Sequence, residues 1–372
     1  MGAPYFSFRK LADEKKVHVC SSNFALYGDM SYRVSQTLRH FCPTLEVYSI
    51  DESFLDVTDI RPENLSGYLY GIRQKVLQWT GIPVSIGVAH TKTLAKLANH
   101  YAKKNPQSGG VFSLVYTDWR RIQSYLSNFD VAEAWGVGRR HSQRLKAKNV
   151  QTALDFVRLE PGEVRQQMGI AGLKTQRELK NQPCFDLDLQ PDSQKNLAVT
   201  RSFREEILDY ENLSQAVSAF AERAAEKMRC KELKCEGVQV YCRTNSFDKS
   251  RPYYSNSYVV GLESATDYTP KIIRAALQGL QKIYRDGFSY KKAGVVLIGL
   301  QGRNKLEQSL FNFDQDSESQ KNLMQAVDQL NKRYGKKTLS YASVGSSTAC
   351  QSTRKMVSPH YTTSWQELLQ VR

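Results

Sequence analysis

The sequence predicts a multidomain α+β protein. Helical and strand-like segments alternate over the first hundred residues, short helices joined by glycine turns fill residues 118–182, and a β-α-β-β-α-β order runs from residue 198 to residue 300. The last order is the plan of a ferredoxin-like domain. A polar segment with two prolines, residues 182–195, predicts a tether between the last two regions.

Apolar spacing places the elements of the first hundred residues. It predicts a helix through Leu11, a helix over 26–41 capped by Ser21–Asn23, and strands over 45–50 and 53–57. A helix over 65–79, a strand over 84–88 and a helix over 92–103 follow. This alternation predicts a sheet covered by helices on one face.

The later elements follow from the same patterns. Strands are expected at 198–203, 237–243, 258–262 and 293–300, with helices at 213–227 and 270–284. A helix near 320–333 and a basic tail rich in serine and threonine close the chain.

Composition narrows the class of protein. Hydrophobic residues make up 41% and charged residues 24%, which is ordinary for a globular protein and excludes a disordered or membrane-embedded chain. Lys and Arg number 52 against 37 Asp and Glu, a formal charge of +15 that favours nucleic acid as partner. A merely basic soluble protein is the alternative. The seven cysteines lack metal-site spacing, and no signal peptide or spanning segment is evident, so we expect reduced thiols, a cytoplasmic location and no membrane association.

Two adjacent carboxylates, Asp51 and Glu52, lie between the two strands expected at 45–57. Neighbouring residues of a regular strand point to opposite faces, so these side chains converge only at a strand end or tight turn. A hairpin here would present both to Mg²⁺, which prefers hard oxygen ligands and shares them with substrate phosphates. Two such ions can hold the attacking and leaving oxygens of a phosphoryl transfer. An acidic turn in solvent is the alternative.

Two further segments suggest contacts with phosphates. Residues 87–98 combine a strand, a glycine turn and a helix start with lysines, which is typical of a phosphate cradle, although a solvated lysine face is the alternative. Residues 134–140, AWGVGRR, match a helix-hairpin-helix turn. There Gly136 and Gly138 would bring backbone N–H groups to a DNA phosphate, and Arg139 and Arg140 would add charge.

These motifs together give a specific resemblance. The run YSIDESF at 48–54, the segment 87–96 and WGVGRR at 135–140 stand in the order and approximate spacing of Y-family (translesion) DNA polymerases of the UmuC type. The likeness continues through AERAAEK at 221–227, IYRDG at 283–287 and SPHYTT at 358–363, so it covers essentially the whole chain.

The resemblance implies five regions. They are a palm with partial fingers (1–116), a helix-hairpin-helix thumb (117–182), a linker (183–196), a little finger (197–302) and a C-terminal extension (303–372). It implies error-prone DNA synthesis past damaged bases in the SOS response, with a two-ion Mg²⁺ site, a primer-template and deoxynucleoside triphosphates. Asp51 and Glu52 would be the second and third palm carboxylates, and Lys96 would contact the nucleotide phosphates. We place Arg201 and Arg243 on the duplex backbone from their strand positions.

Family members begin with a strand that carries the first metal-binding Asp. The start of this chain, Met1–Pro4, resembles the middle of the fingers, so we expect that strand and its carboxylate to be missing here. Two hypotheses follow. In one, the chain begins at an internal Met of a longer, active polymerase; in the other, it is a catalytically inert remnant that binds damaged or primer-template DNA, or polymerase partners, without incorporating nucleotides. A nuclease with a helix-hairpin-helix is a distant third alternative.

The residues around Leu310 and Phe311 bear on partners. Relatives carry a sliding-clamp peptide just beyond the little finger, and the Ser-Leu-Phe end of that peptide matches residues 309–311, whereas its leading Gln-Leu does not. A linker with two apolar residues is the alternative. The resemblance alone implies a UmuD-type dimeric partner and a bacterial, nucleoid-associated location.

Overall fold

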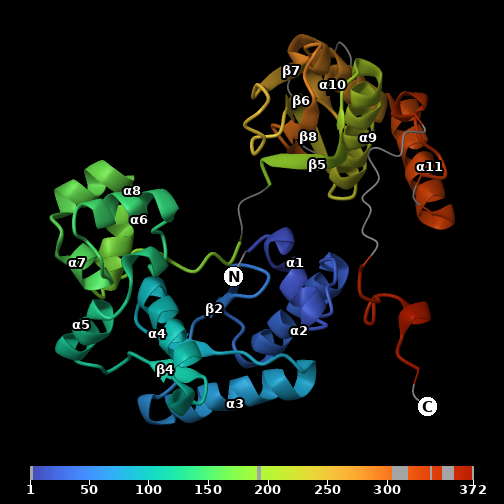
Figure 1. Cartoon of the computed structure of the whole chain (residues 1–372). Coiled ribbons are helices and arrows are strands. Elements are labelled where there is room, and N and C mark those ends of the chain that lie inside the picture. Colours follow the sequence, from blue (N-terminus) through green and yellow to red (C-terminus); the bar gives the residue numbers. More distant parts are fainter. Residues whose placement is uncertain (1–2, 191–193, 304–316, 336, 346–355, 371–372) are drawn as a thin grey trace. The chain divides into compact units, whose positions relative to one another are not determined.

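The computed structural model describes residues 3–190, 194–303, 317–335, 337–345 and 356–370. The chain folds into two compact units (Figure 1). Unit 1 comprises Met1–Pro191 and Arg354–Arg372, and unit 2 comprises Asp192–Thr353. The C-terminal tail therefore belongs with the first half of the chain.

The first part of unit 1 contains four helices and four short strands. Helix α1 (Tyr5–Glu14) and helix α2 (Phe24–Phe41) precede β1 (Leu45–Val47) and β2 (Ser53–Leu55), which pair in antiparallel fashion. Helix α3 (Pro62–Thr80), β3 (Ile86–Val88), α4 (Lys92–Lys104), the 3₁₀ turn η1 (Pro106–Ser108) and β4 (Val111–Ser113) follow, and β3 pairs in parallel with β4. The predicted alternation is confirmed. Within the described residues these strands form two separate pairs; β1, β2 and β3 are shorter than predicted, and β4 was not predicted.

The second part of unit 1 is helical. Helices α5 (Trp119–Ser127), α6 (Arg139–Ala147), α7 (Ala153–Arg158) and α8 (Pro161–Leu179) follow, with a 3₁₀ turn, η2 (Val131–Glu133), between α5 and α6. One apolar core joins these helices to α4: Leu94 and Leu97 of α4 are buried in the same cluster as Leu126, Phe156 and Leu179. Helix α4 therefore connects the strand-containing part of unit 1 to its helical part.

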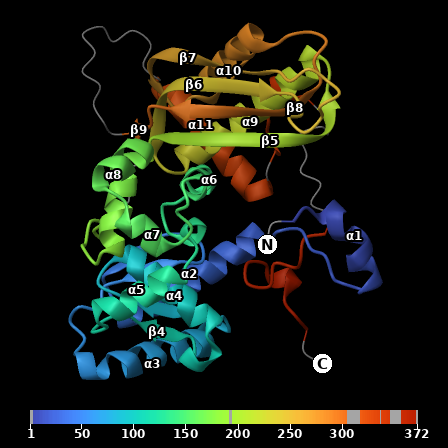
Figure 2. The same ribbon diagram turned by 60° about the vertical axis from the view of Figure 1, so that its left-hand side comes forward.

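Unit 2 has the predicted β-α-β-β-α-β order. Its strands β5 (Asn196–Ile207), β6 (Leu233–Arg243), β7 (Ser255–Thr266) and β8 (Tyr290–Ile298) pair antiparallel in the order β5-β8-β6-β7, and β9 (Gln301–Gly302) adds to β6 (Figure 2). Helices α9 (Tyr210–Arg229) and α10 (Thr269–Ile283) contribute the apolar residues that cover one face of this sheet. The predicted element order is confirmed, and in the sheet β8 lies between β5 and β6.

The chain beyond β9 is divided between the two units. Helix α11 (Glu318–Tyr334) belongs to unit 2, where its Asp328 accepts hydrogen bonds of 2.7 and 2.8 Å from the Arg229 guanidinium of α9. A 3₁₀ turn, η3 (Ala342–Val344), closes unit 2, and another, η5 (Trp365–Glu367), lies in the tail. None of the helices in the described part of the chain is long and apolar enough to cross a membrane.

Cysteine burial differs from site to site. Cys42, Cys235 and Cys242 are buried, whereas Cys20 and Cys230 are exposed. Burial raises the pKa of the Cys242 thiol to about 12, so this thiol stays protonated. Cys184 is partly buried, so three of the six described cysteines are buried.

Gly87 sets how closely β3 packs on α4. A Cβ at this position would lie 2.0 Å from the backbone nitrogen of Asn99 and 2.4 Å from the carbonyl oxygen of Ala95. We predict that Gly87→Ala lowers the free energy of unfolding of unit 1 by about 1–3 kcal/mol, because the helix backbone must shift to admit the methyl group. Urea unfolding followed by circular dichroism measures the change.

Gly67 provides the matched control. It lies in α3, and no atom lies within 4 Å of the position its Cβ would take. Gly67→Ala should raise the free energy of unfolding by about 0.5–1 kcal/mol, since alanine favours the helix. Equal effects of the two substitutions would show that β3 and α4 do not pack as described.

Candidate active site

The Asp51-Glu52 pair lies at the tip of the β1–β2 hairpin. The N–H groups of Tyr48 and Ser49 donate to the Glu52 carbonyl oxygen at 3.1 and 3.0 Å, which closes the turn. The Ser49 hydroxyl donates to Asp51 Oδ1 at 2.7 Å, and Asp51 is exposed. The predicted hairpin is therefore present, with two adjacent carboxylates at its tip.

Lys96 of α4 reaches this hairpin. Its Nζ lies 2.8 Å from Glu52 Oε2 and 5.0 Å from the centre of the Tyr48 ring. The side chains of Lys96 and Glu52 are 25% and 32% exposed, so solvent or a ligand can still reach the pair. The structure thus brings together two of the predicted site residues from separate elements. One turn earlier on α4, Lys92 pairs with Glu46 of β1 and lies 5.0 Å from the Phe54 ring centre.

An aromatic cluster holds the predicted helix-hairpin-helix turn against the hairpin. Trp135 donates from Nε1 to the Tyr48 hydroxyl at 2.9 Å. The Trp135 ring centre lies 5.6 Å from Tyr48, 5.8 Å from Phe54 and 5.2 Å from Phe185. Such contacts contribute about 0.5–1.5 kcal/mol each beyond the buried area. The turn, the hairpin and the segment after α8 therefore meet at one tryptophan.

A buried carboxylate joins α8 and α4 near the same tryptophan. Glu178, at the end of α8, is fully buried and accepts hydrogen bonds from the N–H and hydroxyl of Thr93 at 2.8 Å each. The N–H groups of Cys184 and Phe185 donate to its other oxygen at 3.0 Å each. Thr91, the cap of α4, donates to the Glu178 carbonyl oxygen at 3.0 Å. A buried charge is tolerated when hydrogen bonds surround it, so Glu178 links α8, the start of α4 and the following segment.

Glu46 makes a second polar link to that segment. The Asp188 N–H donates to Glu46 Oε2 at 2.8 Å, and Lys92 donates to the Asp186 carbonyl oxygen at 2.6 Å. Glu46 is 8% exposed although it lies in a strand between two apolar residues. Residues 184–188 are thus fixed to β1 and α4.

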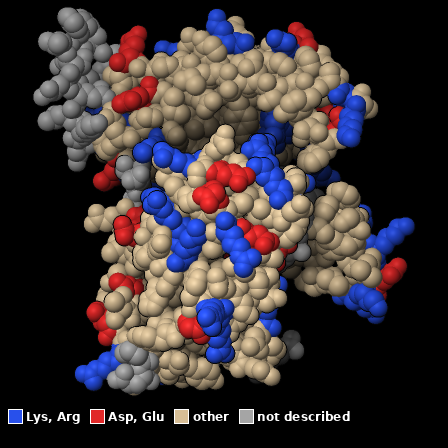
Figure 3. All heavy atoms as spheres, turned by 90° about the vertical axis from the view of Figure 1, so that its left-hand side faces the viewer, with Lys and Arg blue, Asp and Glu red and all other residues tan. Residues whose placement is uncertain are grey.

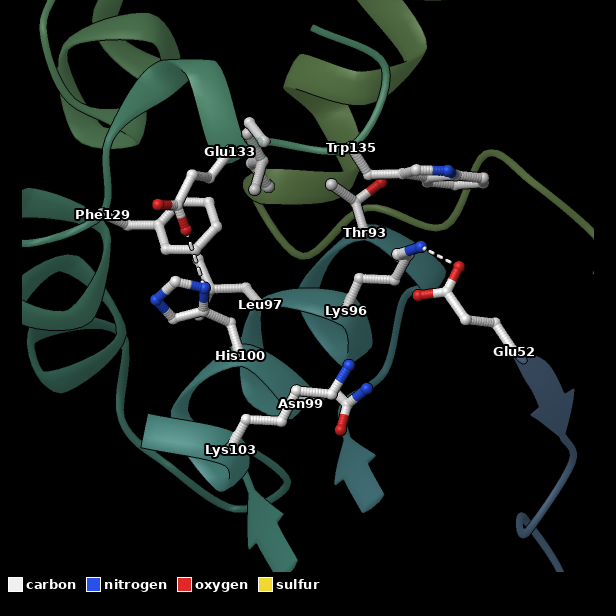
Figure 4. Close-up of a pocket in the computed structure, with 12 residues that line it drawn as sticks. Glu52, Thr93, Lys96, Leu97, Asn99, His100, Lys103, Phe129, Glu133 and Trp135 are labelled. Atoms are coloured by element: carbon white, nitrogen blue, oxygen red, sulfur yellow. Dashed lines mark hydrogen bonds and ion pairs between the residues drawn. The ribbon is translucent and has the colours of Figure 1, made fainter. Parts of the chain in front are cut away.

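A cavity of about 180 Å³ lies beside the Lys96–Glu52 pair. Figure 4 shows Lys96 and Glu52 at one end and His100 and Glu133 at the other. His100 Nδ1 lies 2.8 Å from Glu133 Oε2. Burial lowers the pKa of His100 more than Glu133 raises it, so the imidazole is neutral at pH 7. The cavity lining is Glu52, Thr93, Lys96, Leu97, Asn99, His100, Lys103, Phe129, Glu133, Ala134, Trp135 and Leu179.

The Gly-x-Gly turn has the backbone that its glycines require. Gly136 has a φ of +87°, and a Cβ there would lie 2.6 Å from Thr175 Oγ1 of α8. Gly138 caps α6, and exposed Arg139 and Arg140 are the first residues of that helix. The predicted first helix of the motif is only the three-residue turn η2. Figure 3 looks onto the face that carries α5–α8, where lysine and arginine side chains stand among acidic ones.

The two arginines chosen from strand position lie on opposite faces of the unit 2 sheet. Arg201 is in register with Ala293, whose side chain faces the core under the helices, and Arg243 is in register with Lys292 on the other face. Arg201 and Arg243 therefore do not share one face of the sheet. Leu310 and Phe311 lie outside the described residues.

The hairpin tip offers carboxylate oxygens to a metal ion. Among the residues that the structure describes, no group of three or more His, Cys, Asp or Glu side chains is arranged to hold a metal. Asp51 and Glu52 supply hard oxygen donors, and Mg²⁺ is commonly held by one or two carboxylates together with substrate phosphates. The donor chemistry of the hairpin thus fits Mg²⁺ completed by a substrate.

Comparison with known proteins identifies the family. A sequence profile of the impB/mucB/samB family matches residues 1–100, and the profile of its C-terminal domain matches residues 194–310. Protein UmuC of Salmonella typhimurium is 39% identical over 373 residues, covering 100% of this chain and 88% of that protein. The chain belongs to the impB/mucB/samB family. Family membership confirms the predicted resemblance to Y-family DNA polymerases of the UmuC type.

Other matches agree with this family. Protein ImpB of Salmonella typhimurium is 37% identical, covering 99% of this chain and 87% of that protein. A solved Y-family DNA polymerase chimera of Dbh and Dpo4 has a TM-score of 0.56 at 20% identity, covering 74% of this chain and 76% of that one, and shows the fold. Residues 321–371 match a domain of unknown function, DUF4113.

The sequence patterns missed the residues that hold this site together. Glu178 follows three polar or charged residues within a helix, and this pattern is typical of a solvent-exposed side chain. The sequence gives one weak indication of the role of Glu46, because a carboxylate between apolar strand residues needs a polar partner if it is buried. Trp135 precedes the glycine turn in the sequence, and no neighbouring residue indicates its contact with Tyr48.

We predict that Glu178→Gln destabilises unit 1. The glutamine NH₂ group would face N–H or O–H donors that now bind a carboxylate oxygen, so these donors would lose their acceptor. We expect this to lower the free energy of unfolding by about 2–4 kcal/mol. Urea unfolding measures the loss of stability, and limited proteolysis should cut residues 182–190 faster.

Glu160→Gln is the control for this substitution. Glu160 is an exposed residue that precedes α8 and makes no side-chain capping bond. Its replacement should change the free energy of unfolding by less than about 0.5 kcal/mol. If Glu178→Gln unfolds like Glu160→Gln, the buried link does not stabilise the unit.

Proposed function

We propose that this protein performs template-directed DNA synthesis past damaged bases by two-Mg²⁺ nucleotidyl transfer. The observation that carries the proposal is the Asp51-Glu52 hairpin beside Lys96, in a chain of this polymerase family. Nucleotidyl transfer needs clustered carboxylates to hold cations, together with a lysine for phosphate charge.

Asp51 and Glu52 would hold Mg²⁺, which supplies charge stabilisation for the transferred phosphoryl group. Lys96 would bind the triphosphate of the incoming deoxynucleotide. Its ion pair with Glu52 keeps the ammonium at the hairpin before substrate arrives, at a partly exposed position where partners can exchange. Glu178 and Thr93 position α4, and thereby Lys96, against the hairpin.

The remaining regions supply DNA contacts in this proposal. Residues 1–116 would be palm and fingers, 117–182 thumb, 183–196 linker, 197–302 little finger, and 303–372 the extension. The N–H groups around Gly136 and Gly138, with Arg139 and Arg140, would bind the duplex backbone. Arg243 would do so from the face of the sheet that the helices leave open, whereas Arg201 would contact DNA only at the sheet edge.

Partners and location extend the same proposal. Primer-template DNA and deoxynucleoside triphosphates are the substrates. A sliding clamp would bind at Leu310 and Phe311, and a UmuD-type dimer is proposed from family membership. The protein would act in the bacterial cytoplasm on the nucleoid.

Primer extension by the chain tests the catalytic roles. We predict that Asp51→Asn lowers Mg²⁺-dependent incorporation by about a hundredfold or more, since the charge stabilisation removed amounts to several kcal/mol. Lys96→Ala should lower kcat/KM for the nucleotide about tenfold to a hundredfold. Asp59→Asn, an exposed residue beyond β2, is the control and should extend primers normally.

The outcome separates the two functional hypotheses. Incorporation by the unaltered chain that Asp51→Asn abolishes supports the polymerase. Salt-dependent binding to primer-template without any incorporation would overturn it in favour of the inert DNA-binding protein.

DNA binding is predicted to depend on the start of α6. Replacing Arg139 and Arg140 together by Gln should weaken primer-template binding, and the slope of log K against log salt should become shallower by about 0.9 for each phosphate that is no longer neutralised. Fluorescence anisotropy from about 50 to about 200 mM salt measures the slope. Lys75→Gln, on the exposed side of α3, should leave it unchanged. An unchanged slope in the double variant would remove α6 from the DNA interface.

A further inference from the structure

The C-terminal tail lies against the junction between α1 and α2. Residue Ser358 of the tail and Asn23 of the junction are 335 positions apart in the sequence but in hydrogen-bond contact. Figures 1 and 2 show the tail near the first helices, and both segments belong to unit 1. The tail contains the end of the region that matches the domain of unknown function.

Asn23 is the centre of this contact. Its side chain is 1% exposed, and its Oδ1 accepts the Leu26 N–H at 3.2 Å as the cap of α2. Its Nδ2 donates to the Ser358 carbonyl at 2.9 Å, the Ser358 hydroxyl at 3.2 Å and the Pro359 carbonyl at 3.3 Å. One buried amide therefore caps α2 with its oxygen and binds the tail with its nitrogen.

Two further contacts flank Asn23. The Ser21 N–H donates to the Met356 carbonyl oxygen at 2.8 Å, and Ser21 forms a parallel β-bridge with Val357. On the other side, Thr362 lies beside Asp29 of α2 and is the largest cause that lowers the pKa of that carboxyl. The hydrogen bonds to the junction thus run along the tail from Met356 to Pro359.

The tail carries its own turn. The N–H groups of Thr363 and Ser364 donate to the His360 carbonyl oxygen at 3.0 and 2.9 Å. The His360 N–H donates to Glu367 Oε2 at 2.7 Å. A segment that is already ordered loses less conformational entropy when it docks.

We propose that residues 356–363 are an intramolecular docking segment whose receptor is the α1–α2 junction, with Asn23 as the residue on which docking depends. Because α11 belongs to unit 2, the extension returns the chain to unit 1 after a first crossing near residue 191. Docking within one chain benefits from a high effective concentration, so a small contact is sufficient.

Hydrogen–deuterium exchange on the full chain, read by mass spectrometry, tests the docking. Asn23→Asp keeps an oxygen to cap α2, and Asp caps as well as Asn, but the variant has no N–H to donate. Exchange in a peptide covering residues 356–364 should rise about tenfold or more, while α2 stays protected. Asn64→Asp, an exposed residue of α3 with the same change of charge, is the control and should exchange as the unaltered chain does.

A reciprocal variant keeps Asn23 and removes its partner. Replacing residues 356–363 by a glycine-serine segment of equal length should accelerate exchange at the Ser21 amide, whose acceptor is the Met356 carbonyl. If Asn23→Asp also disturbs α2, the reciprocal variant still tests whether the tail docks. Equal tail exchange in the unaltered chain and Asn23→Asp, with unchanged Ser21 exchange in the reciprocal variant, would overturn the proposal. Tail protection that grows with protein concentration would also overturn it, because the receptor would then be a second copy.

Discussion

A carboxylate removed from water must be surrounded by hydrogen-bond donors, and Glu178 meets this constraint with four. Two come from Thr93 at the start of α4 and two from the backbone after α8. Because displacing any of these segments would leave the buried charge short of donors, the end of α8, the start of α4 and residues 184–185 are held together. Helix α4 in turn carries Lys96 to the hairpin.

The candidate site therefore depends on residues that lie beneath the carboxylates rather than among them. The Trp135 ring fixes the hairpin from one side, through Tyr48 and Phe54, and Glu46 ties the chain after α8 to β1 from another. Asp51 itself is left exposed at the tip of the hairpin. A rigid support beneath exposed carboxylates is the arrangement expected where ligands must bind without reorganising the site.

Local patterns predicted the features that depend on neighbouring residues. The cap at Asn23, the hairpin around Asp51 and the order of elements in unit 2 all follow from spacing, and the structure confirms them. Glu178 could not be predicted, because its partners are set by tertiary packing and its helix position resembles a surface charge. The tail contact of Asn23 was missed for the same reason. Arg201 and Arg243 show a related limit, since the face that a strand residue occupies depends on the exact register.

We propose that the tip of the hairpin, Asp51 and Glu52, is a divalent-cation site completed by substrate. Electron paramagnetic resonance with Mn²⁺ tests it directly, because bound Mn²⁺ loses the sharp signal of the free ion. With primer-template and a deoxynucleoside triphosphate present, the unaltered chain should bind Mn²⁺ beyond what the nucleotide binds alone, and Asp51→Asn should remove that binding. Equal Mn²⁺ binding by the unaltered chain and Asp51→Asn would contradict the claim.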